Sequence, residues 1–173
     1  MIRAALGAAM LAMAGLAAPA VAQPQATPAA RCDLSAVEIV TRFSQLFFIE
    51  KKWREAFLTY VAEDYTQHNP MAEDGRAAAL AHLGPVFDAN PQLKIDIKRI
   101  FGDETHVAVH YHSVMKPGDL GAAAVDMFRV EDCKIVEHWD VIQPIPAFSV
   151  SGRSMVDGPL EPGRTKRPPN PGE

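Results

Sequence analysis

The sequence predicts an α+β domain in which three N-terminal helices pack on one face of an antiparallel β-sheet. Apolar residues recur at helical spacing as far as Asp88. After Pro91, apolar and polar residues alternate instead, as they do along strands with one buried face. Helices followed by a run of strands are typical of α+β domains whose helices gather on one side of the sheet.

The three expected helices span Leu34–Ile49, Trp53–Val61 and Gly75–Asp88. Ser35 and Glu38 have the spacing of a capping box at the start of the first helix. An extended segment and a turn, Glu63–Pro70, join the second helix to the third, because a residue that precedes proline disfavours the α region.

Four strands are expected at Leu93–Lys98, Thr105–Met115, Ala124–Val130 and Ile135–Gln143. The last two are rich in β-branched and aromatic residues and flank a short polar turn, which indicates an antiparallel hairpin. Side chains alternate between the faces of a strand, so His138, Asp140 and Ile142 share one face, as do Asp126 and Phe128. A half-buried strand rarely points Asp and His inward unless they are paired or functional, so this hairpin is the candidate wall of an active site.

The chain is expected to have four regions: a signal peptide (1–22), a disordered leader (23–32), one domain (33–148) and a Pro/Gly-rich tail (149–173). A positive start, a short apolar segment and an A-x-A site predict cleavage after Ala22, hence a secreted or periplasmic protein. No later segment is long and apolar enough to span a membrane.

The net charge of −4 and the absence of a basic run interleaved with aromatic residues argue against nucleic acid as a partner. Export to an oxidising compartment favours a disulfide between the two cysteines, Cys32 and Cys133. The alternative is two free, inert thiols.

Candidate chemical residues occur in four segments, and they converge on one cavity if the sheet curls around the helices. They are His110 and His112 on one strand, Asp126 on the next, His138 and Asp140 on the last, and Tyr65, His68 and Asn69 before the third helix. Asp140 is interpreted as a general acid/base or as the carboxylate that orients a histidine, and the alternative is a partner for a surface Arg or Lys. A small hydrophobic substrate would contact the following residues: Tyr65, Asn69, His110, His112, Phe128 and Ile142.

Several roles stay open at this point. Asp126 either donates, protonated, to an enolate oxygen or pairs with Arg129 or a histidine. His68 either acts as a base or bonds its own backbone. His110 and His112 with His138 and Asp140 could ligate zinc or iron, but their spacing is unspecific, and no metal or other cofactor is expected. His82 and His106 are expected at the surface.

Two motifs resemble those of SnoaL-like polyketide cyclases. One is the run Lys134–Val141 following Asp126-x-Phe128-Arg129, and the other is Asp64–Pro70 with Gly75 just beyond. The resemblance covers roughly Ser35 to Pro146. It implies the cone-shaped, cystatin-like α+β barrel of the nuclear transport factor 2-like superfamily, with a strongly curved sheet around the helices, a deep apolar pocket and usually a homodimer.

The resemblance also implies roles for the two aspartates. In the cyclases the aspartate matched by Asp140 is the acid/base for an aldol closure without a cofactor. In the related steroid isomerases the aspartate matched by Asp126 is a neutral donor to an enolate. This chain departs from the isomerases, because its first helix has no tyrosine and Asn69 stands where they have a basic aspartate.

The sequence therefore predicts an exported acid/base enzyme that acts on a small hydrophobic carbonyl compound without a cofactor, as an aldol-type cyclase, an isomerase or a lyase. Asp140 would move the proton, positioned by His68 or His138, while Asp126 or a histidine stabilises the oxyanion. The alternative is a periplasmic module that binds a small molecule in the same pocket without turnover. Fold similarity alone does not identify the substrate.

Overall fold

The computed structural model describes residues 32–158, 160 and 164. The expected signal peptide, the leader up to residue 31 and most of the expected tail lie outside the described residues. Within the described part of the chain, no helix is long and apolar enough to cross a membrane.

The helices lie close to the predicted positions. They are α1 (Ala36–Ser44), α2 (Trp53–Tyr60) and α3 (Arg76–Ala89), and a π-helical turn, η1 (Gln45–Ile49), continues α1. The predicted capping box starts α1: the Ser35 hydroxyl accepts the Glu38 backbone N–H, and the Glu38 carboxylate accepts the Ser35 N–H.

The sheet has five strands, one more than the sequence predicted. They are β1 (Val61–Gln67), β2 (Lys94–Gly102), β3 (His106–Val114), β4 (Ala122–Glu131) and β5 (Lys134–Pro144). Their order is β1-β5-β4-β3-β2, and β1 pairs with β5 in parallel. The expectation of a purely antiparallel sheet is therefore corrected to a mixed one. The extended segment before the third helix joins the sheet edge, a long-range pairing that no local pattern encodes.

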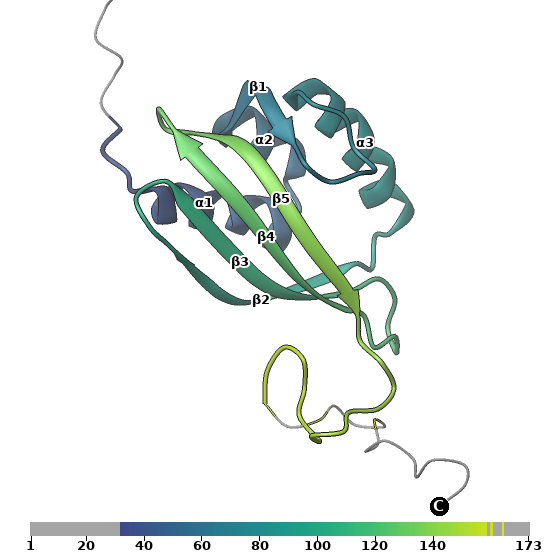
Figure 1. Ribbon diagram of the computed structural model, residues 1–173. Helices are drawn as coiled ribbons and strands as arrows, with labels where there is room; N and C mark the ends of the chain where they lie inside the picture. Colours follow the sequence, from purple (N-terminus) through teal and green to yellow (C-terminus); the bar gives the residue numbers. More distant parts are fainter. Residues whose placement is uncertain (1–31, 159, 161–163, 165–173) are drawn as a thin grey trace, which may run out of the picture.

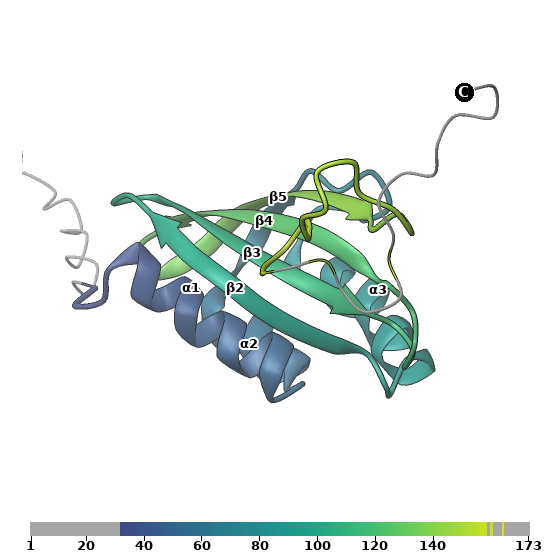
Figure 2. The ribbon, with the colours of Figure 1, turned by 90° about the horizontal axis from the view of Figure 1, so that it is seen from below.

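The molecule has two layers, with α1 and α2 packed against one face of the curved sheet (Figures 1 and 2). Aromatic rings hold the layers together. Phe43 of α1 stacks on Phe47 with ring centroids 5.2 Å apart, and it meets Phe57 of α2 and Phe128 of β4 edge-on at 5.5 Å. On the other face, the segment after β5 is tied to β2, where Arg99 donates to the Val156 carbonyl.

The hairpin of β4 and β5 forms as predicted, with one irregularity. Asp132 and Cys133 both have positive φ angles and make the two-residue turn that matches the strand twist. Val130 pairs with Ile135 and Arg129 pairs with Glu137, so Val136 is the extra residue of a β-bulge. The bulge shifts the alternation of side chains by one residue. As a result, Ile135 rather than Val136 is buried on the same inner face as His138.

Cys32 and Cys133 are joined by a disulfide that spans 101 positions of sequence. The bond fixes the start of the domain to the β4–β5 turn. Closing so long a loop reduces the conformational freedom of the unfolded chain, which stabilises the folded state.

Replacing both cysteines (Cys32→Ser with Cys133→Ser) is expected to lower the free energy of unfolding by about 2–4 kcal/mol. Denaturant unfolding of the purified protein measures this change. Wild type under reducing conditions serves as the control and should match the double variant. An unchanged unfolding midpoint would show that the bridge adds no stability.

Candidate functional site

A cavity of about 260 Å³ lies between the inner face of the sheet and the helices. Most of its wall is apolar, and polar side chains of β1, β3, β4, β5 and the segment after β1 line the rest. The cavity is lined by expected site residues, namely Tyr65, Asn69, Asp126, Phe128, His138, Asp140 and Ile142. Alternation along the β4–β5 hairpin brings Asp126, Phe128, His138, Asp140 and Ile142 to the inner face, as the period of a strand requires.

Two amide side chains fix the polar wall, and the backbone determines their orientation. The Gln67 Oε1 accepts the backbone N–H of Asn69 at 2.9 Å, and the Asn69 Oδ1 accepts the backbone N–H of Met71 at 2.8 Å. Because a backbone N–H can only donate, these oxygens are acceptors, and the amide nitrogens point the other way. Gln67 Nε2 then donates to the Tyr65 hydroxyl at 3.1 Å.

The same amides fix the tautomer of His138 and the position of the Asp140 carboxyl group. His138 Nδ1 lies 2.8 Å from Gln67 Oε1, so Nδ1 carries a proton and donates it. In neutral His138 the basic nitrogen is therefore Nε2. Asn69 Nδ2 donates to Asp140 Oδ2 at 2.6 Å, which holds this carboxyl group in place at the cavity wall.

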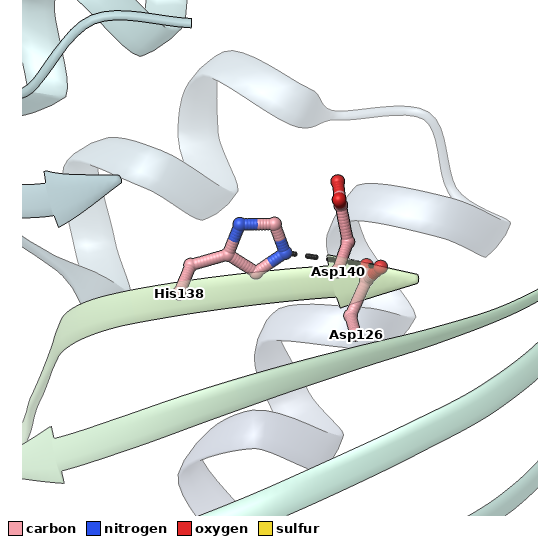
Figure 3. Close-up of side chains that lie close together, drawn as sticks. All are labelled: Asp126, His138 and Asp140. Atoms are coloured by element: carbon pink, nitrogen blue, oxygen red, sulfur yellow. Dashed lines mark ion pairs between the residues drawn. The ribbon is translucent and has the colours of Figure 1, made fainter. Parts of the chain in front are cut away.

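Asp126 and Asp140 are direct cross-strand partners on β4 and β5, and His138 lies two residues before Asp140. Figure 3 shows all three side chains on the same side of the sheet, with His138 Nε2 turned towards Asp126 at 3.8 Å. The Tyr111 hydroxyl donates to Asp126 Oδ1 at 3.0 Å. Asp126 and His138 are buried, 6% and 8% exposed, so the pair lies in an environment where charge interactions are strong.

One atom from each of Asp126, His138 and Asp140 lies within 4.8 Å of the others. This is the group of described residues that could hold a cation. Gln67 fixes the tautomer that leaves Nε2 available, as hydrogen-bond acceptors on the other ring nitrogen do for metal-ligating histidines. The other ligand set considered from the sequence, with His110 and His112, is not assembled.

Three expected site residues lie elsewhere. His68 is on the outer side of β5, where its ring stacks on Trp139 at 4.8 Å and its Nε2 lies 2.9 Å from Glu137 Oε1. It follows the last residue of β1, so the strand alternation that turns Gln67 inward turns His68 outward. His68 therefore does not contact the inner carboxylates.

His110 and His112 also lie outside the lining of the cavity. They flank Tyr111, whose ring is buried, so their side chains leave the opposite face of β3. His110 Nδ1 accepts from Arg99, and His112 Nε2 donates to the Leu120 carbonyl. Burial lowers the pKa of His110, and Arg99 lowers it further. Both are contacts of the outer face, so the expectation that His110 and His112 converge on the cavity with the other candidates is corrected.

Sequence reasoning also missed residues that line the cavity. Gln67, Tyr111 and Ser113 contribute polar groups, and His82 of α3, expected only as a surface residue, lies at its wall. The signal for Tyr111 was available, because Val107, Val109 and Tyr111 form the apolar alternation of β3 and should face the core.

Comparisons with known proteins agree with this architecture. The SnoaL-like domain family matches residues 40–138, and the chain belongs to this family. No curated protein matched the chain.

Solved structures show the same fold at low identity. A protein from Kribbella flavida is 20% identical, with a TM-score of 0.54 over 63% of this chain and 87% of its own. A candidate polyketide cyclase from Acidithiobacillus ferrooxidans is 18% identical (TM-score 0.51, 65% and 91%). A candidate SnoaL-like isomerase from Agrobacterium tumefaciens is 14% identical (TM-score 0.52, 61% and 94%). The predicted fold class is thereby confirmed.

The two tyrosines of the cavity are expected to stay protonated in alkaline solution. Burial raises the pKa of Tyr65 and of Tyr111 well above 10.0, and the Asp126 carboxylate raises both further. A Tyr60→Phe variant retains only these two tyrosines. Its near-ultraviolet phenolate absorbance should stay flat as the pH passes 10 and rise only when the protein unfolds.

The same shift predicts how stability changes with pH. The unfolded chain loses these protons near pH 10 while the folded chain keeps them, so the free energy of unfolding falls as the pH rises above that value. Titration in denaturant is the control. Phenolate absorbance that rises while circular dichroism remains native would contradict the burial of both hydroxyl groups.

Proposed function

We propose that the cavity is the active site of an enzyme that moves a proton next to the carbonyl group of a small hydrophobic compound, without a cofactor. Aldol-type cyclisation, isomerisation and lyase cleavage share this first step. The observation that carries the proposal is the convergence of Asp126, His138 and Asp140 on one polar wall of an otherwise apolar cavity.

In the proposed reaction, the Asp140 carboxylate removes a proton from the carbon beside the carbonyl, and the C–H electron pair moves to the carbonyl oxygen as an enolate. Asn69 holds Asp140 in the orientation that keeps its carboxyl group at the cavity wall. In a cyclisation the enolate carbon attacks a second carbonyl, and Asp140 gives its proton to the alkoxide that forms. In an isomerisation Asp140 returns the proton to a different carbon of the conjugated enolate. In a lyase reaction the enolate collapses and breaks the bond to a leaving group on the neighbouring carbon, which takes the proton from Asp140.

The enolate oxygen requires donors, and the polar wall supplies them. The Tyr65 oxygen accepts from Gln67, so its own O–H can donate to a bound oxygen, and the raised pKa of Tyr65 keeps that proton in place. Asp126, whose Oδ1 accepts from the Tyr111 hydroxyl and lies 3.8 Å from His138 Nε2, borders the proposed position of the enolate oxygen. Tyr65 thus adds a donor to the groups predicted from the sequence to stabilise the oxyanion, which are Asp126 or a histidine.

The family supports the reaction class, since neighbours with this fold include a candidate polyketide cyclase and a candidate isomerase. Asp140 pairs with neither Arg129 nor Lys134: Arg129 binds Glu131 and Glu137, and Lys134 donates to the Thr59 carbonyl. A carboxylate that is positioned by an amide rather than neutralised by a cation is available for proton transfer.

Turnover tests the proposal. The compound that copurifies with the protein is identified by mass spectrometry, and its conversion is measured for wild type and for Asp140→Asn. The loss of the proton acceptor is expected to lower kcat by about 10²–10⁴-fold while binding persists, because general acid–base catalysis contributes this much. Asp119→Asn, an exposed carboxylate in the β3–β4 loop, should retain full activity.

Two results would count against an enzyme. Equal turnover by Asp140→Asn and wild type would remove Asp140 from the mechanism. Tight binding without conversion by wild type would instead favour the second candidate, a module that binds the compound in the same cavity.

The proposed location is outside the cytoplasm, and the Cys32–Cys133 disulfide supports it because such bonds persist in oxidising compartments. Fractionation of cells that express the full chain should find a mature form beginning at Gln23 in the exported fraction, as terminal sequencing by mass spectrometry will show. An uncleaved chain starting at Met1 in the cytoplasm would contradict export.

A further inference from the structure

As far as the structure describes the chain, the lining of the cavity includes carboxyl groups and no permanently charged cation. Among the described residues, no lysine or arginine lines it, whereas Asp126 and Asp140 both do. Within the described part of the chain, the basic side chains at its wall are those of His82 and His138. An anionic ligand would therefore meet two carboxyl groups without a guanidinium or ammonium partner, which is costly in an environment poor in water.

Two arginines close in sequence to lining residues are bound elsewhere. Arg129, between the inward residues of β4, binds Glu131 and Glu137. Arg76, at the start of α3, bonds the Val61 carbonyl and Glu63. None of these contacts involves a cavity carboxylate, so neither arginine neutralises Asp126 or Asp140.

The apolar wall supplies a second, independent feature. Besides aliphatic side chains, it contains the aromatic rings of Phe43, Phe47, Phe48, Phe57, Phe87 and Phe128. The faces of such rings carry partial negative charge and attract cations, and cages of aromatic rings with a carboxylate suit organic ammonium groups. A wall of this composition packs against the apolar part of a ligand and also tolerates a positive charge on the polar group of that ligand.

We propose that the compound bound in this cavity is a hydrophobic amine, with its protonated amino group beside Asp126 and Asp140 and its apolar body among the phenylalanine rings. The inference rests on the proposed function in one respect: the amine would be the substrate class of that active site, an amino-carbonyl compound. The ammonium group donates to carboxylate oxygens, while the carbonyl oxygen faces the Tyr65 hydroxyl.

Three probes that share one apolar body test the charge preference of the full chain: 2-naphthylmethylamine, 2-naphthylmethanol and 2-naphthoate. Isothermal calorimetry at neutral pH is expected to give at least about tenfold tighter binding for the amine than for the alcohol, and the weakest binding for the carboxylate. Asp140→Asn and Asp126→Asn should each reduce the preference for the amine, while Asp119→Asn should retain it.

Equal binding of amine and alcohol, tighter binding of naphthoate, or no binding of the amine would overturn the inference. These outcomes are separate from the test of turnover. Conversion of a neutral compound through Asp140 would support the proposed function and overturn the inference that the ligand is an amine. A preference for the amine without conversion of any amino-carbonyl compound would support the amine inference and overturn the proposed enzymatic function.

Discussion

The site depends on the parallel pairing of β1 with β5. This pairing aligns Gln67 with His138, and it brings Asn69, just beyond the strand, to Asp140. Since backbone N–H groups orient both amides, the polar wall is determined by main-chain geometry rather than by mobile side chains. The tautomer of His138 follows directly, because one proton position is fixed at Nδ1. A precise arrangement of this kind is what proton transfer requires.

The strand alternation also sorts charge between the two sides of β5. The inner side presents His138 and Asp140 to the cavity, whereas the outer side presents Glu137, which binds Arg129 and His68. The chain therefore places its ion pairs with arginine on the wet face, where they cost little to form. The inner carboxylates are left with hydroxyl and amide partners, which position them without neutralising them.

Much of this organisation could be predicted from local patterns, and the exceptions have clear causes. The period of two along the hairpin correctly predicted that Asp126, His138 and Asp140 share one face. The bulge at Val136 shifts the alternation earlier in β5, so that Ile135 is the buried residue there. The pairing of β1 at the sheet edge could not be predicted, because it joins segments separated by the whole of β2 to β4. Gln67 was missed for the same reason.

The histidines of β3 show how residue type can mislead. His110 and His112 share a face of β3, which suggested a site. The largest apolar residues of a strand, however, determine which of its faces is buried. Val107, Val109 and Tyr111 are all buried, and burying them leaves the histidines on the outer side. The same rule explains why Asp126 is inward, since it shares its face with Ala124 and Phe128. A polar residue within a buried apolar alternation is thus a stronger indication of function than a cluster of reactive residues on the opposite face.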